Sequence, residues 1–289
     1  MNAVVENVRN IAAVGALPRA ITDCLNYGNP EVPEDLWALE QGVKGITDAA
    51  NALGEGGEAI PVISGNVSLY NTTKEGPIDP TANVCMIGTM PEAKKAVSMR
   101  IKEVGSTLYL LGERKDECGG SAYYQVLESL AGEKRSAFLG KNVPSPDFKE
   151  VQKEVSVMTE AIEKQLVSAS HDISEGGLLL ALFEMMTPAR GIGGEIGIAI
   201  DVSSLDSKLR TDTLLFSETG GFVLEVPKEN VKAFESLSKK HKVNAFKIGT
   251  TTKALELTVR RNGSKVLSLN MKELLTLWSE SLEKALESA

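Results

Sequence analysis

Apolar residues near the N-terminus recur three and four positions apart, a spacing that gathers them on one face of a helix. This pattern predicts a helix over residues 3–14 and a second helix over 34–53. Residues 15–33, between them, are rich in Gly, Pro, Asn and Asp, so we predict that this stretch is mostly loop. Short apolar runs then predict strands at 60–64 and 83–90.

This order of elements indicates an α/β (α+β) chain with a first domain over residues 1–97 and a second over 98–289. In the second domain we predict helices at 148–166, 177–186 and 271–287, and strands at 107–111, 196–201, 221–226, 254–260 and 265–269, the last two joined by a hairpin at Asn262-Gly263. In the last helix, the apolar residues expected to face inward are Leu274, Leu275, Trp278, Leu282 and Leu286.

Composition narrows the classes of function. The formal net charge is −8 (31 − 39), whereas nucleic-acid binding normally needs a basic surface. No apolar run reaches the roughly 18 residues of a membrane span.

The three cysteines lie far apart in the sequence, which fits a reducing cytoplasm and not a disulfide framework. With two histidines, a His-rich transition-metal site is not expected, and any metal should be oxygen-bound, magnesium above all.

Polar residues crowd around glycines in two segments of the first domain. The segment ITDCLNYGNPE places Asp23 and Asn26 in a predicted loop, where a surface turn is the simpler interpretation. In SGNVSLYN, Gly65 lets a ligand approach the backbone, and Asn66 offers an oxygen to a hard cation. Ser68 shares a face with Asn66 if the chain is extended there.

A third segment, SHDISEGGLLLAL, brings Asp172 and Ser174 to the start of an apolar helix, where free amides favour phosphate. Helix capping by Ser174 is the alternative. Glu6 and Asn10 share a helix face, and both offer oxygen to a cation, although by themselves a solvated helix face is the simpler interpretation. Two further segments, CGGSAYY before a predicted helix and FSETGG before a predicted strand, either wrap a phosphate or turn the chain. None of these segments matches the P-loop or a kinase signature.

Taken in order, NIAAVGALPRAITDCLNYGNPE, IPVISGNVSLYN, HDISEGGL and LFSETGG resemble formylglycinamide ribonucleotide amidotransferase, also called phosphoribosylformylglycinamidine synthase subunit II. The first two strings are specific to this family, and the last two recur in the superfamily of aminoimidazole ribonucleotide synthetase. The resemblance spans nearly the whole chain and is to the second half of the family protein. It implies a PurM-like architecture, in which the N-terminal domain closes a barrel with the other half and the C-terminal domain has an open mixed sheet.

The resemblance also implies two sets of site residues. For the active site, Asp23 and Gly65 match ATP-binding positions, Asn66 matches a magnesium ligand, and Ser68 matches a contact to the substrate phosphate. For a pseudo-symmetric auxiliary site, Glu6, Asn10 and Asp172 match magnesium ligands. Ser174 matches a nucleotide contact of the same site.

In the family reaction, the γ-phosphate of ATP activates the formamide oxygen of formylglycinamide ribonucleotide, and ammonia then displaces phosphate to give the amidine. The resemblance therefore implies ATP and Mg²⁺ as cofactors. The implied partners are the N-terminal half of the synthase, a glutaminase subunit and a small bridging subunit. The family's catalytic histidine lies in the first half, and neither His171 nor His241 fits its motif, so we expect no complete active site here. The exposed edge of an unpaired barrel sheet favours a homodimer.

Two other classes of function stay open. The first is a nucleotide-binding structural or regulatory module of the same superfamily, in which bound nucleotide stabilises the fold without any activity of the chain. The second is a superfamily kinase or synthetase that acts alone, against which the first two strings argue.

Overall fold

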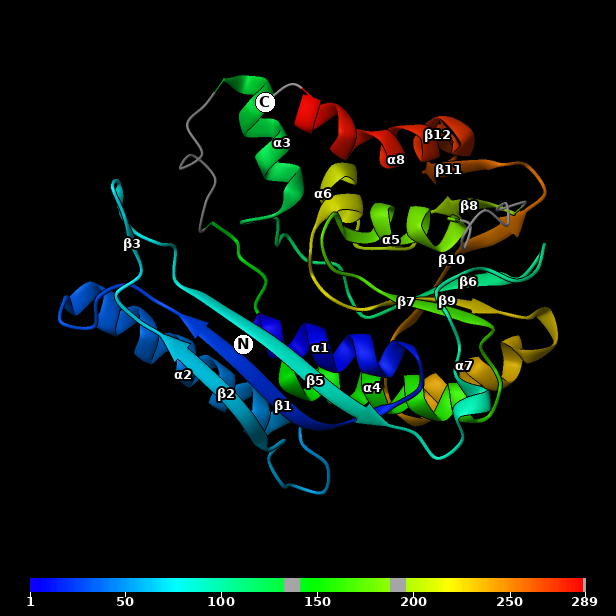
Figure 1. Ribbon diagram of the computed structural model, residues 1–289. Helices are drawn as coiled ribbons and strands as arrows, with labels where there is room; N and C mark the ends of the chain where they lie inside the picture. Colours follow the sequence, from blue (N-terminus) through cyan, green and yellow to red (C-terminus); the bar gives the residue numbers. More distant parts are fainter. Residues whose placement is uncertain (133–140, 188–195, 288–289) are drawn as a thin grey trace.

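The first domain is built from two helices and three long strands. The protein is described by a computed structural model, which covers residues 1–132, 141–187 and 196–287. Helices α1 (Asn2–Ala13) and α2 (Pro33–Leu53) confirm the two predicted helices. The strands β1 (Leu17–Asn26), β2 (Val62–Ser68) and β5 (Thr81–Thr89) form a sheet in the order β2-β1-β5, and a small hairpin of β3 (Thr72–Thr73) and β4 (Gly76–Pro77) follows β2 (Figure 1).

The prediction that residues 15–33 are mostly loop is wrong, because β1 occupies the middle of that stretch. The strand runs parallel to β2 on one side and antiparallel to β5 on the other, so its backbone is hydrogen-bonded along both edges. Its pairing with β5 shifts register between Pro18 and Ala20, where proline has no amide hydrogen to donate. Pairing with distant strands thus overrides the local turn chemistry.

The second domain is a seven-stranded mixed sheet with helices on both faces. The strand order is β12-β11-β8-β10-β6-β9-β7. The strands are β6 (Thr107–Leu111), β7 (Ala169–Asp172), β8 (Gly197–Asp201), β9 (Phe222–Val226), β10 (Ala245–Thr252), β11 (Glu256–Arg261) and β12 (Ser264–Asn270). The helices are α3 (Ala122–Ala131), α4 (Phe148–Glu163), α5 (Gly177–Met186), α6 (Thr211–Phe216), α7 (Val231–Lys240) and α8 (Met271–Glu287), with short 3-10 turns at Ala93–Lys95 and Lys228–Asn230.

Most of the predicted elements of this domain are confirmed within a few residues. The prediction missed the short elements β7 and α6, and also β10 and α7, which have eight and ten residues. The open mixed sheet agrees with the predicted architecture. No helix in the described part of the chain is long and apolar enough to span a lipid bilayer.

The inward orientation predicted for α8 is wrong for its second half. Met271 is buried, and Leu274 and Leu275 pack against the second core. Trp278, Leu282 and Leu286, in contrast, are 60%, 71% and 71% exposed. The apolar stripe is periodic along the whole helix, but the domain covers its first turns alone.

Two apolar cores hold the molecule together, and the first is shared by both domains. Val4, Val8 and Ala12 of α1 belong to the same buried cluster as residues of α4 and β9. Figure 1 shows α1 in the middle of the molecule, between the three-stranded sheet and the larger sheet. The second core lies under α5, where Leu178 and Leu182 are fully buried. Helix α1 is therefore a structural part of both domains.

The three-stranded sheet is open, and the described residues form no closed barrel. Val62, Ile63 and Val67 of the edge strand β2 are all exposed. An exposed apolar edge strand is a surface that normally pairs with another chain or segment. The barrel closed by another half of the protein stays a prediction.

Candidate functional site

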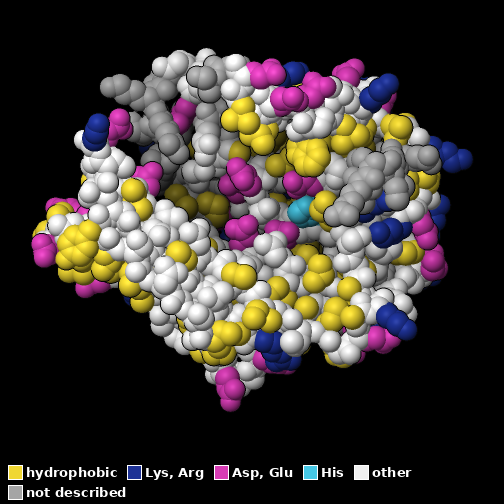
Figure 2. All heavy atoms as spheres, viewed as in Figure 1, with side chains coloured by type: hydrophobic (Ala, Val, Ile, Leu, Met, Phe, Trp, Pro, Cys, Tyr) yellow, Lys and Arg dark blue, Asp and Glu magenta, His cyan; other side chains and the backbone are white. Residues whose placement is uncertain are grey.

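A cavity of about 910 Å³ lies where α1 of the first domain meets the starts of α3 and α5 in the second. Its lining comes from α1, from the loops before α3 and α4, and from the segments around residues 172–175 and 218–220. Figure 2 shows acidic side chains gathered around the hollowed centre of this face. Because α1 packs into both domains, this cavity is a junction between them.

The cavity is strongly acidic. Its described lining carries three cations, Arg9, Lys115 and Lys242, against nine carboxylates, which are Glu6, Glu113, Glu117, Asp147, Glu150, Glu154, Asp172, Glu175 and Glu218. A free polyphosphate would be repelled by such a surface, whereas a cation or a cation-complexed anion would be attracted.

Glu6 and Asp172 line this cavity, and Asn10, four residues after Glu6 on α1, lies next to Asp172. The Asn10 carboxamide faces Asp172, and its nitrogen donates to Oδ1 and Oδ2 at 2.8 and 3.0 Å when it is turned toward the carboxylate, an orientation assigned from the hydrogen-bond network. Burial raises the pKa of Glu6, as do the nearby carboxylates, which are Asp172, Glu175 and Glu218. Two carboxylates and a carboxamide that share a site in this way suit a hard cation, which would relieve the repulsion.

The described residues contain no group of three His, Cys, Asp or Glu side chains placed to hold a metal. Two such residues, Glu6 and Asp172, line the cavity. The amide of Asn10 directs its nitrogen toward Asp172 and would have to turn its oxygen to that side to bind a cation with it. Magnesium normally keeps several water ligands and needs one or two carboxylates from a protein. The residues present therefore fit magnesium better than a metal that requires a closed protein shell.

Ser174 lines the same cavity, two residues before Gly176 at the start of α5. Among the described residues, α5 has no side chain that caps its first turn, so capping by Ser174 is not observed. The backbone oxygen of Ser174 instead accepts a hydrogen bond from the amide of Gly177 at 3.1 Å.

His171 lies behind this set and is held by two carboxylates. Its Nδ1 is 2.7 Å from the backbone oxygen of Asp172 and 3.2 Å from Oδ1 of the same residue, and its Nε2 is 3.2 Å from Oε2 of Glu184. Burial opposes the charged form, but the hydrogen bonds to both carboxylates raise the pKa of His171 to about 10. A ring that donates from both nitrogens cannot accept a proton, so the contacts of His171 are those of a structural side chain.

The other predicted residues lie on the three-stranded sheet, outside the lining of this cavity. In the parallel pairing of β1 with β2, Asp23 is opposite Gly65, and Asn26 is opposite Ser68. A side chain on Gly65 would place its Cβ 2.3 Å from Oδ1 of Asp23, so the missing side chain is what admits the carboxylate. Because successive residues of a strand point to opposite faces, Asn66 and Ser68 share one face, and Asp23 lies on the other.

The two faces of this sheet have different surroundings. Asp23 is on the side of Ile21 and Met86, which belong to the core under α1. Asn66 is exposed on the open side, and Ser68 donates to Oδ1 of Asn71 at 3.2 Å. The structure therefore brings the four active-site candidates onto neighbouring strands, but it does not bring all four side chains together.

Sequence reasoning missed two residues of the cavity, Arg9 and Glu218. The Arg9 guanidinium contacts Glu154 at 3.3 Å and lies over Gly220, where a Cβ would come within 1.6 Å of its Nη1. Glu218 accepts hydrogen bonds at the starts of α3 and α5. The sequence signals for them are the position of Arg9 between Glu6 and Asn10 and the acidic residue inside FSETGG.

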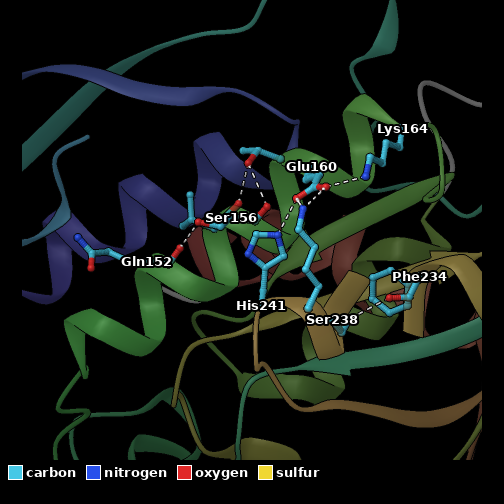
Figure 3. Close-up of polar contacts among 10 residues, drawn as sticks. Gln152, Ser156, Glu160, Lys164, Phe234, Ser238 and His241 are labelled. Carbon is cyan, nitrogen blue, oxygen red and sulfur yellow. Dashed lines mark hydrogen bonds and ion pairs between the residues drawn. The ribbon is translucent and has the colours of Figure 1, made fainter. Parts of the chain in front are cut away.

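The second histidine belongs to an ion cluster on the surface, away from the cavity lining. Nε2 of His241 is 2.6 Å from Oε2 of Glu160, and Figure 3 shows His241 and Lys164 pointing toward that carboxylate. Hydrogen bonds from Lys164, Lys240 and His241 lower the pKa of Glu160 to about 2. This arrangement agrees with His241 as part of a charged run and gives it no contact with the candidate site.

Two family models match the chain. The N-terminal domain of AIR synthase related protein matches residues 1–90, and the C-terminal domain of AIR synthase related protein matches residues 103–262. Curated relatives called phosphoribosylformylglycinamidine synthase subunit PurL are 37% identical in Methanothrix thermoacetophila and 36% identical in Alkaliphilus metalliredigens, over 98% and 99% of this chain. Since the alignments cover 35% and 36% of those proteins, the chain spans about a third of their length.

Solved structures share the fold at low identity. Thermotoga maritima PurL complexed with FGAR has a TM-score of 0.73 and 17% identity, over 94% of this chain and 42% of that one. The same protein complexed with ATP has a TM-score of 0.70 and 16% identity, over 94% and 40%. At these identities the structural likeness establishes the two-domain fold alone. Which ligands this chain binds has to be argued from its own residues.

Proposed function

Because this chain belongs to the AIR synthase related proteins, we propose that it is part of the synthase that converts formylglycinamide ribonucleotide, ATP and glutamine-derived ammonia to formylglycinamidine ribonucleotide. The curated relatives bear that enzyme's name at 36–38% identity. The observation that carries the proposal is that Glu6 of α1 and Asp172 of β7 line one cavity, with Asn10 hydrogen-bonded to Asp172. The chain supplies nucleotide, magnesium and substrate contacts, and the N-terminal half supplies the catalytic histidine.

The cavity is the nucleotide site of this chain. Nine carboxylates against three cations exclude a bare polyphosphate but accept its magnesium complex. Glu6, Asn10 and Asp172 would hold the ion, and magnesium, when bound, neutralises phosphate charge. The hydroxyl of Ser174, at the start of α5, is placed to bond a phosphate oxygen.

The sheet carries this chain's share of the synthase site. On the open face, Asn66 contributes to a magnesium site and Ser68 holds the substrate phosphate. Asp23 and Gly65, the proposed ATP contacts, lie on the opposite face, toward the core under α1. That open face needs a cover, because its edge strand is exposed. The N-terminal half would cover it, and a glutaminase with a small bridging subunit would supply the ammonia.

Titration calorimetry with Mg²⁺-ADP tests the cavity. Asp172→Asn should weaken binding at least tenfold, because it removes one of two metal-binding charges. Asn66→Ala, on the sheet, should leave this binding unchanged. Equal affinities of Asp172→Asn and the unaltered chain would contradict the assignment of the cavity.

Reconstitution tests the synthase role. The chain mixed with the N-terminal half should form formylglycinamidine ribonucleotide from ATP, ammonia and substrate, and Asn66→Ala should lower that rate. Synthase activity of the chain alone would contradict the proposal that its active site is incomplete without the N-terminal half. Nucleotide binding without any activity in the mixture would favour the regulatory module instead.

A further inference from the structure

The two remaining glycine-bearing segments, CGGSAYY and FSETGG, meet at the floor of the cavity. Oε1 of Glu218 accepts hydrogen bonds from the backbone amides of Ala122 and Gly176, each at 3.0 Å. Ala122 begins α3 and Gly176 precedes α5, so one carboxylate serves the starts of two helices. Free amides at a helix start attract anions, and in this structure the Glu218 carboxylate is the anion that these two amides bind.

The loop that carries Glu218 is fixed on several sides. The Arg114 guanidinium donates to the backbone oxygens of Ser217 and Thr219. The hydroxyl of Thr219 donates to Oε2 of Glu117 at 2.8 Å, and the amide of Glu218 donates to the backbone oxygen of Glu117 at 3.2 Å. The position of the Glu218 carboxylate therefore follows from the loop and needs no ligand.

We propose that Glu218 is a specificity-determining residue of the cavity: its carboxylate takes the helix-start amides that a phosphate would otherwise use and so makes nucleotide binding depend on magnesium. This inference rests on the proposed function of the cavity. It assigns to FSETGG the presentation of an acidic side chain, not the wrapping of a phosphate.

Glu218 can make nucleotide binding depend on magnesium because its charge lies near Ser174, the residue proposed to bind phosphate. Ser174 is two residues from Gly176, whose amide Glu218 occupies. Glu218 also lines the same cavity as Glu6 and Asp172, the proposed magnesium ligands. At this spacing a carboxylate repels an uncomplexed phosphate and attracts a cation, so it discriminates between free and metal-bound nucleotide.

The test is titration calorimetry of the purified chain with ADP, once with Mg²⁺ and once with a chelator. Glu218→Gln keeps the oxygen that accepts both amides but removes the charge, and it should bind magnesium-free ADP about tenfold more tightly than the unaltered chain. Glu218→Asp keeps the charge on a shorter side chain and should retain the original magnesium dependence. Glu175→Gln is the matched control, since Glu175 also lines the cavity but is exposed to screening solvent, and it should change the affinity less than threefold.

The outcomes separate this inference from the proposed function. If the unaltered chain binds Mg²⁺-ADP and Glu218→Gln shows the same ratio of affinities with and without magnesium, the inference is wrong and the proposed function stands. An equal gain in Glu175→Gln, or a gain in Glu218→Asp, would also overturn it. If the unaltered chain binds ADP under neither condition, both proposals fail.

Discussion

Replacing Arg9 with methionine tests whether one buried ion pair holds α1 to α4 and thereby joins the two domains. The Arg9 and Glu154 side chains are 12% and 7% exposed, and Nη2 lies 3.3 Å from Oε2. Removing the guanidinium leaves the carboxylate buried without its cation, and breaking a buried pair from one side costs about 3–5 kcal/mol. Because the contact is single and long, we expect a loss of about 3 kcal/mol in the free energy of unfolding at pH 8.

The loss should depend on pH. Burial raises the pKa of Glu154, and Arg9 opposes that rise. Without Arg9 the pKa of Glu154 rises further, because the cation that opposes the effect of burial is gone. A carboxyl whose folded pKa lies above its unfolded pKa keeps its full contribution to stability below the unfolded value and loses it as pH rises through the folded value. The deficit of Arg9→Met should therefore shrink as pH falls from 8 to 5.

Urea unfolding at pH 8 and pH 5 measures both effects. Lys153→Met is the matched control, since it removes a cation from an exposed pair with Glu150 on the same helix, and its effect should stay within about 0.5 kcal/mol. Arg9→Met combined with Glu154→Gln should recover part of the loss, because no charge is then buried unpaired. A loss below about 1 kcal/mol at pH 8, or an equal loss at both pH values, would refute this account of the pair.

Three further predictions follow from burial and charge. Leu182→Ala, in the second core, should lower the free energy of unfolding by about 2–5 kcal/mol, whereas Leu282→Ala on the exposed part of α8 should change it by less than about 0.5 kcal/mol, both by urea titration. The pKa of His171 is raised to about 10, so its contribution is full below about pH 6.5 and lost as pH rises toward 10; His171→Asn should flatten that decline in unfolding free energy. The pKa of Glu160 is lowered to about 2, so its contribution is present above about pH 4.5 and lost as pH falls toward 2, and Glu160→Gln should flatten the acid limb of thermal unfolding.

The sequence predicts an element well where one strong local pattern decides it. Helix α5 is found at its predicted bounds because an apolar run follows two glycines that mark its start. Strand β6 is likewise a short apolar run, and all its residues are buried. In β1 the local signals favour a turn, and strand pairing on both sides decides otherwise. In α8 the apolar periodicity predicts which side of the helix packs on the domain. It does not predict how many turns of the helix are covered, and the second half is exposed.

The candidate site shows a similar division. Glu6 and Asn10 were predicted to share a helix face, which α1 confirms, but nothing in their local pattern connects them with Asp172, more than 160 residues away. That connection is an expectation from the family resemblance; in the structure Glu6 and Asp172 line one cavity, and Asn10 is hydrogen-bonded to Asp172. The role of Glu218 could not be predicted, because its two partners are backbone amides, which every sequence supplies equally.

The position of α1 links the cavity to the stability of the whole chain. One side of this helix packs into a core that both domains line, and the other side carries Glu6, Arg9 and Asn10. Asn10 meets Asp172 of β7, and Ala13 accepts a hydrogen bond from Ser170 of the same strand, so α1 is tied to β7 at two points. A ligand that holds Glu6 to Asp172 strengthens the same junction and stabilises the folded chain by RT ln(1 + [L]/Kd). Nucleotide binding in the cavity should therefore raise the stability of both domains together, although the first domain contributes little more than α1 to the site.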